Sequence, residues 1–324
     1  MVLWGLFFFQ YFIISLLLPL TKVFALTPLP LVNKVSAPTA RSSLLDSIRI
    51  IAIKALGEAQ RNNVSLCEIE FPPLLGEKNE FADVDNVQIL NRNRDWSMLT
   101  ASELANEYGE ALWLAFPDRK ELELATEAWP GRAYQKCTLT TIEDAASVLA
   151  GKEQVAQPWG AQFSRFFEKQ ITQEGAILGA RPETASAPPP KLIFAVQPGD
   201  GGPLEDWLNL EQCELNDGFL ISCNGAFDKL RGGYYPPIIF PKLASCVDRF
   251  ISRFETLLYL KSLNEKGRGG WIFRVYPEDW QVHLQDRAGG NTLLVLQSAT
   301  RPTYQEAVDA LLRGKPVVSS SASF

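Results

Sequence analysis

The chain has 324 residues, of which 46% are hydrophobic and 21% are charged, and its formal net charge is -6. An acidic balance without a dense run of Lys and Arg argues against sequence-independent binding to nucleic acid, because such binding neutralises phosphates with basic side chains. Without an N-terminal leader, about 300 residues would remain, which is near the upper limit for one hydrophobic core. We therefore expect a globular protein that does not bind nucleic acid.

The N-terminal region is free of Asp and Glu as far as residue 45. Val2–Leu20 is an almost uninterrupted apolar run, and Val23-Phe24-Ala25 follows as a site that a signal peptidase could cleave. Residues 26–41 are rich in Thr, Pro, Ser and Ala and weakly basic. A signal peptide over residues 1–25 and a transit-like segment over 26–41 are typical of import into a complex plastid.

Two alternatives for this leader stay open. The apolar run is long enough for a retained membrane anchor, since a span takes about 20 residues, and a secreted protein would begin in the same way. The cysteines argue against secretion, because their number is odd, they lie far apart and none forms a C-x-x-C pair. Cys67 and Cys223 lie in apolar runs typical of strands, where a thiol behaves as a small buried hydrophobe. We expect a plastid protein whose mature form is soluble or peripheral to a membrane.

The elements of the N-terminal half follow from apolar periodicity, breakers and caps. A capping-box pattern at Thr100-x-x-Glu103 opens one helix, and Pro72-Pro73 stops a strand. A polar loop extends through Asn93. The predicted elements are a helix at 43–62, a strand at 65–71, helices at 100–116 and 120–128, a strand at 136–142, a helix at 143–150 and an amphipathic helix at 159–173.

The C-terminal half follows a loose Pro- and Ala-rich stretch at 175–190, which is a surface insertion or a boundary between two lobes. The predicted elements are strands at 191–196 and 218–223, helices at 204–213 and 242–263, a hairpin of 271–276 with 280–285, a strand at 291–297 and a helix at 303–312. Residues 314–324 are expected to be a frayed, disordered tail.

Short apolar strands that alternate with helices favour a parallel sheet covered on both faces. The expected fold is therefore α/β, a mainly parallel three-layer sheet over residues 42–313 that finishes in an antiparallel hairpin and so becomes mixed.

Several short motifs occur in an order that resembles a known family. They are Glu68-Ile69-Glu70-Phe71-Pro72-Pro73-Leu74, Leu114-Ala115-Phe116-Pro117-Asp118, the strand 217–224 that ends in Asn, the helix-like 250–259, Arg274-x-Tyr276-Pro277 with Trp280, and Arg301-Pro302. Over roughly residues 42–312 the chain is similar to the DUF1995-type domain, which occurs in the chloroplast low-PSII-accumulation-three protein and in the C-terminal region of a chloroplast adenylate kinase. This chain has Asn224-Gly225 where relatives often have Asn-Pro.

The resemblance implies a plastid or cyanobacterial protein without established catalytic residues. We therefore expect a non-enzymatic auxiliary or assembly factor for photosynthetic complexes of the photosystem II type, with a protein partner in the plastid, a photosystem subunit among the candidates, and no cofactor. The α/β pattern and the fusion to an adenylate kinase support an alternative, a nucleotide- or phosphometabolite-binding protein or enzyme.

No catalytic motif is convincing. His283 is the only histidine and lies in a predicted strand, and neither a His pair nor a Cys pair has metal-ligand spacing. Residues 197–203 lie between a strand and a helix, as phosphate loops do. They lack a Lys, and the acidic Glu205 and Asp206 after them would repel a phosphate. Asp83 and Asp85 could hold a ligand through oxygens, but a solvated loop is the preferred interpretation, because the remaining ligands of a calcium loop are missing.

Residues 224–237 are the preferred candidate for binding a partner. They follow a predicted parallel strand and combine glycines with residue types that often anchor interfaces. The candidates are Asn224, Asp228, Lys229, Arg231, Tyr234 and Tyr235. The alternative is a flexible crossover loop whose tyrosines pack on the long helix predicted at 242–263.

Overall fold

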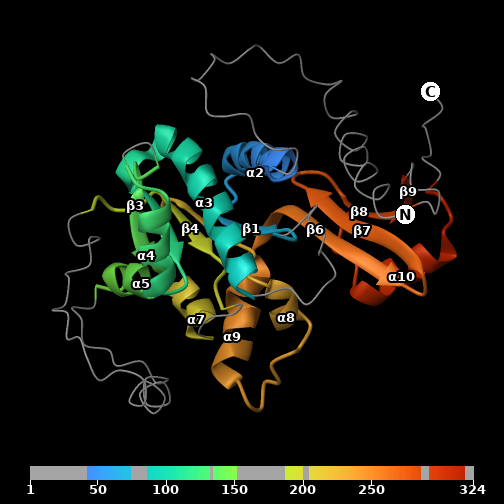
Figure 1. Ribbon diagram of the computed structural model, residues 1–324. Coiled ribbons are helices and arrows are strands. Elements are labelled where there is room, and N and C mark those ends of the chain that lie inside the picture. The colour runs from blue at the N-terminus through green and yellow to red at the C-terminus, as the bar shows by residue number, and fades with distance from the viewer. Residues whose placement is uncertain are drawn as a thin grey trace.

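The computed structural model describes residues 42–73, 86–131, 134–151, 187–199, 204–285 and 292–317. Their strands form one nine-stranded sheet in the order β3-β2-β4-β5-β1-β6-β7-β8-β9 (Figure 1). The strands are β1 (Leu66–Glu70), β2 (Leu112–Phe116), β3 (Thr138–Thr141), β4 (Leu192–Val196), β5 (Phe219–Cys223), β6 (Glu255–Glu265), β7 (Arg268–Val275), β8 (Trp280–Gln285) and β9 (Thr292–Ser298). The run from β3 to β6 is parallel, and β6 to β9 are antiparallel. The expected mixed α/β sheet is confirmed.

Helices cover both faces of this sheet. They are α2 (Ser42–Arg61), α3 (Asn86–Tyr108), α4 (Arg119–Ala128), α5 (Ile142–Leu149), α7 (Glu205–Gln212), α8 (Phe227–Arg231), α9 (Pro241–Arg249) and α10 (Tyr304–Arg313), with short 3-10 turns at Gly109–Ala111 and Ile251–Arg253. Helices α2, α3 and α4 pack on one face. Helices α5, α7, α8 and α9 pack on the other, where α10 covers the antiparallel strands.

The strand β2 shows how one short segment serves both layers. Leu112, Leu114 and Phe116 point into the layer of α3 and α4, and Trp113 and Ala115 point into the layer of α5 and α7. All five side chains are buried. A parallel strand covered on both faces therefore reads as a continuous apolar run without polar alternation.

Two predicted helices are wrong in the same way. The helix predicted at 100–116 begins earlier, as α3 at Asn86 instead of a polar loop, and it ends at Tyr108, so that Leu112–Phe116 is strand β2. The long helix predicted at 242–263 ends as α9 at Arg249, and β6 takes up Glu255–Glu265. Leu112–Phe116 and the stretch 256–260 of β6 are mainly apolar and buried, so helical and strand periodicity cannot be told apart there.

The segment 224–237 also differs from a flexible crossover loop. It holds the short helix α8, and only the part after Arg231 is a loop. The amphipathic segment 159–173, the candidates Asp83 and Asp85, and most of 175–190 lie outside the described residues. At the other end, residues 314–317 are held, since the Val317 N–H donates to the Leu294 carbonyl at 2.9 Å, and 318–324 lie outside the described part.

The carboxyl ends of β1 and β5 lie at a topological switch point. The chain leaves β1 towards α3 on one face, and it leaves the neighbouring β5 towards α8 on the opposite face. Ligands of open α/β sheets bind where such connections diverge. Among the described helices, none combines the length and the apolar character that crossing a membrane requires.

Candidate functional site

Asn224 lies at this switch point and is used to join elements. Its side-chain oxygen accepts the Phe71 N–H at 2.8 Å, and its amide donates to Asn93 of α3 at 2.7 Å. Asn93 in turn donates to Gln197 at the end of β4. Since all three amides are buried, they fill the crevice between the diverging connections with a protein network.

The turn between β4 and α7 has the position of a phosphate loop in the sequence. In the part that the structure describes, acidic side chains follow it in the first turn of α7. The pKa of Asp206, in the first turn of α7, is raised to about 8. Burial is the main cause, the charges of Asp118, Glu143 and Glu205 add to it, and a hydrogen bond from the Gly199 backbone opposes it. A carboxyl group that is already difficult to ionise indicates a poor environment for a second anion. The geometry thus disfavours a phosphate at the described part of this turn, and residues 200–203 lie outside it.

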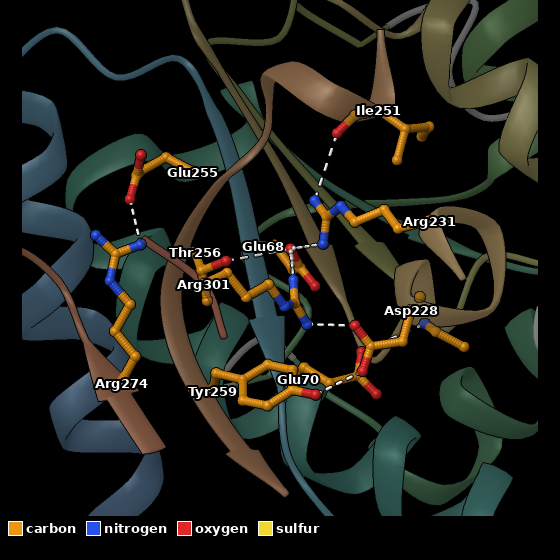
Figure 2. A network of polar contacts seen from close by, with 12 residues as sticks. Glu68, Glu70, Asp228, Arg231, Ile251, Glu255, Thr256, Tyr259, Arg274 and Arg301 are labelled. Carbon is orange, nitrogen blue, oxygen red and sulfur yellow. Dashed lines mark hydrogen bonds and ion pairs between the residues drawn. The ribbon is translucent and has the colours of Figure 1, made fainter. Parts of the chain in front are cut away.

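Glu68 of β1 anchors a buried cluster of charges beneath α8 (Figure 2). Its Oε2 accepts from Arg231 Nη1 at 2.7 Å and from the Thr256 hydroxyl at 3.3 Å, and it lies 3.5 Å from Arg301 Nη1. The Glu68 side chain is 2% exposed, whereas the two arginines are about a quarter exposed, at 24% and 23%. Arg231 is therefore a structural partner of the sheet.

Asp228 of α8 extends the same cluster. Its carboxylate accepts from the Tyr259 hydroxyl at 2.5 Å and from Lys261 Nζ at 2.9 Å, and it also binds Arg301. Burial by itself raises the pKa of Asp228, but the charges of Arg301 and Lys261 and the Tyr259 hydrogen bond hold it below its ordinary value. Asp228 thus stays ionised and fixes α8 to β6.

Arg301 completes the cluster from the segment before α10. Its guanidinium lies over the rings of Tyr259, at 4.4 Å, and of Trp280, at 4.9 Å. Arg274 lies near the Trp280 ring as well, at 5.3 Å, and pairs with Glu255 at 2.5 Å. Stacked, hydrogen-bonded guanidinium groups suit partly buried ion pairs, and here they tie the hairpin to the parallel half of the sheet.

The loop after α8 has the opposite character, because its apolar side chains face solvent. Ile238 is 96% exposed, Tyr234 is 72% exposed and Ile239 is 67% exposed. Pro236 and Pro237 are exposed too. We call Tyr234, Pro236, Pro237, Ile238 and Ile239 the apolar tip. In Figure 1 the loop that carries it projects below α8 and α9.

A groove lies beside the apolar tip, between α7 and α9. It is lined by Leu208, Glu211, Gln212, Pro241, Lys242, Ser245 and Arg249. Arg249 and Glu211 pair across it at 2.6 Å. Pro241 and Lys242 of the groove follow the loop directly in the sequence, so the groove and the tip are neighbours.

The six candidate residues of segment 224–237 therefore fall into two groups, those that are held in the fold and those that are exposed. Asn224, Asp228 and Arg231 are bound into the fold, and Tyr235 is half-buried against Trp207, with ring centroids 5.4 Å apart. Lys229 and Tyr234 are exposed. The two isoleucines of the tip lie just beyond the candidate segment, and nothing in the local sequence signals that they face solvent.

His283 lies in β8, as its sequence context indicates. It is buried, its Nε2 is 2.8 Å from Gln281 Oε1, and burial lowers its pKa to about 4. It faces β7 and β9 in the antiparallel part of the sheet. Within the described residues, no three Asp, Glu, His or Cys side chains are grouped as metal ligands.

Comparison with known families finds a match over most of the chain. The model of the family described as "Domain of unknown function (DUF1995)" matches residues 43–309. The curated proteins hold no match to the chain, and neither do the solved structures.

Proposed function

We propose that this chain, which belongs to the DUF1995 family of domains of unknown function, is a non-enzymatic auxiliary factor of a plastid. It assists the assembly of photosynthetic complexes of the photosystem II type by binding a protein partner. The plastid location rests on the carboxylate-free leader, and the kind of complex rests on the motifs shared with the low-PSII-accumulation-three protein.

One structural observation carries the binding role. The groove lies open beside an exposed apolar tip, while the charged residues of α8 that could do chemistry, Asp228 and Arg231, hold the fold together. Exposed apolar side chains that gather on one face mark an interaction site. We assign the protein partner to the groove between α7 and α9.

A pull-down from solubilised thylakoid membranes tests this assignment. Ser245→Phe places a ring in the groove, and Ser245→Ala leaves the groove open as the matched control. Since Ser245 is exposed, both variants should melt within a few degrees of the wild type. Photosystem II subunits should be recovered with the wild type and with Ser245→Ala, and Ser245→Phe should lose them. Recovery that is equal for all three proteins rules out the groove, and a lack of any photosystem subunit rules out the function.

The alternative of a nucleotide- or phosphometabolite-binding protein is tested separately by thermal shift. A ligand at 100 times its dissociation constant stabilises the folded state by about 2.7 kcal/mol. We expect no shift with ATP, ADP or sugar phosphates, given the acidic surroundings of Asp206. A clear shift with one of them would favour the alternative.

A further inference from the structure

The apolar tip is a defined structure. The Tyr234 N–H donates to the Lys229 carbonyl at 3.0 Å, and the Ile239 and Phe240 N–H groups donate to the Pro236 carbonyl at 3.0 and 2.9 Å. Tyr235 packs between Trp207 and Phe240, with ring centroids at 5.4 and 5.3 Å. The isoleucines are thus held outward by a closed turn on an aromatic base, and their exposure belongs to the folded state.

The segment that carries the tip is basic, whereas the protein as a whole is acidic. Residues 229–247 contain Lys229, Arg231 and Lys242 and no Asp or Glu, in a chain whose net charge is -6. Arg231 turns inward to Glu68. The exposed lysines, Lys229 and Lys242, flank the tip on its two sides in the sequence.

We infer that the apolar tip inserts into the interface of an anionic lipid membrane, with Lys229 and Lys242 facing the headgroups. A projecting tip needs no cavity to bury itself in lipid, whereas on a protein it would need a matching pocket. Exposed aliphatic side chains beside a tyrosine and basic residues are the composition of interfacial membrane anchors. Each lysine near an anionic surface strengthens binding about fivefold.

This inference goes beyond the proposed function, and its test needs no protein partner. The full chain is used, with an environment-sensitive fluorophore on the single accessible thiol of Ile238→Cys. The native cysteines are all buried, so the label goes to position 238. The matched control is Ala128→Cys, an exposed site on α4, on the opposite face of the sheet. Each labelled protein is mixed with vesicles of phosphatidylglycerol and with vesicles of phosphatidylcholine.

We expect a blue-shifted, at least twofold brighter emission at position 238 with phosphatidylglycerol vesicles, and no change at position 128. Adding Lys229→Gln and Lys242→Gln should weaken this response about 25-fold in lipid concentration, because two fivefold contributions are lost. In the unlabelled chain, Ile239→Ser should weaken cosedimentation with the vesicles. If the leader also binds the vesicles and masks this effect, the fluorophore at position 238 still reports whether the tip enters the lipid.

Three results would overturn the inference. The first is an unchanged emission at position 238 with anionic vesicles, even when the leader brings the protein to them. The second is an equal change at positions 238 and 128, which indicates nonspecific adsorption. The third is a response that requires photosystem proteins in the vesicles, which would assign the tip to a protein contact.

Discussion

Glu68 is a buried carboxylate that accepts from Arg231 and lies close to Arg301, although the three residues are far apart in the sequence. A buried ion pair adds little net stability when it is complete, but the loss of one partner leaves a charge without compensation. The cluster is therefore best understood as a lock that sets the position of α8, and with it the position of the apolar tip.

Replacing Glu68 tests this lock. We expect Glu68→Gln to lower the free energy of unfolding by about 3 kcal/mol, because Arg231 loses its carboxylate partner in a partly buried place. Urea denaturation followed by circular dichroism measures the change. Glu103→Gln removes the exposed partner of Arg49 and should cost no more than about 1 kcal/mol. Equal losses in the two variants would contradict a role specific to the buried cluster.

The single histidine gives the protein a defined acid sensitivity. Burial holds the pKa of His283 at about 4, below the value of about 6.5 in an unfolded chain. Between these two values the unfolded chain binds a proton that the folded protein does not, so stability is complete above pH 6.5 and falls as the pH drops towards 4.

From pH 7 to pH 5, we expect this histidine to cost the wild type about 2 kcal/mol of unfolding free energy, since one pKa unit corresponds to about 1.4 kcal/mol. His283→Gln should lose correspondingly less over the same range. Urea titrations at the two pH values measure the difference. If both proteins lost the same amount, another group would be responsible.

At the scale of elements, α10 is the part that local sequence specifies most fully. Thr303 accepts from the Glu306 N–H at 3.2 Å, and the Glu306 side chain accepts from the Thr303 N–H at 2.8 Å. This capping box was readable in the sequence as Thr303-x-x-Glu306, because all its partners lie within one turn. It also fixes the start of the helix, because its N-cap Thr303 lies two residues after Arg301.

We expect Thr303→Ala to lower the stability by about 1 kcal/mol, because the N3 amide of α10 loses its acceptor. Thermal and urea denaturation measure the loss. Thr300→Ala, an exposed threonine just outside the helix, should stay within about 0.5 kcal/mol of the wild type. A larger loss at position 300 than at position 303 would show that the cap is not what stabilises this end.

The strands β2 and β6 show where local sequence is insufficient. Residues 112–116 and 255–263 continue the helices that the sequence predicts, but both belong to interior strands of the sheet. A strand in which polar and apolar residues alternate is easier to identify. Strand β8 is an example, because it has both buried and half-buried residues. When both faces are covered, that mark is lost.

At the scale of the whole molecule, the fold encloses all five cysteines as free, buried thiols. Burial raises the pKa of Cys67 and Cys213 to about 12 and that of Cys137 and Cys246 to about 11. It raises the pKa of Cys223 as well. The expectation that Cys67 and Cys223 act as buried hydrophobes is confirmed.

We expect the native thiols to react with a colorimetric disulfide reagent at pH 8 at least about 100-fold more slowly than the thiols of the unfolded chain, because the thiolate is the reactive form. In urea, all five should react. Stopped-flow absorbance measures both rates. A rapidly reacting thiol in the native protein would show that one of these cysteines is accessible.

The amino-acid sequence by itself determined the family, the α/β class, the antiparallel finish and the capped last helix. These features depend on short motifs in a fixed order, or on contacts within a few residues of the chain. Only the tertiary structure decided that β2 and β6 are strands, that Arg231 pairs with Glu68, and that Ile238 and Ile239 face solvent. Exposure and pairing across more than a hundred residues depend on which elements come to lie side by side, and no local pattern encodes that.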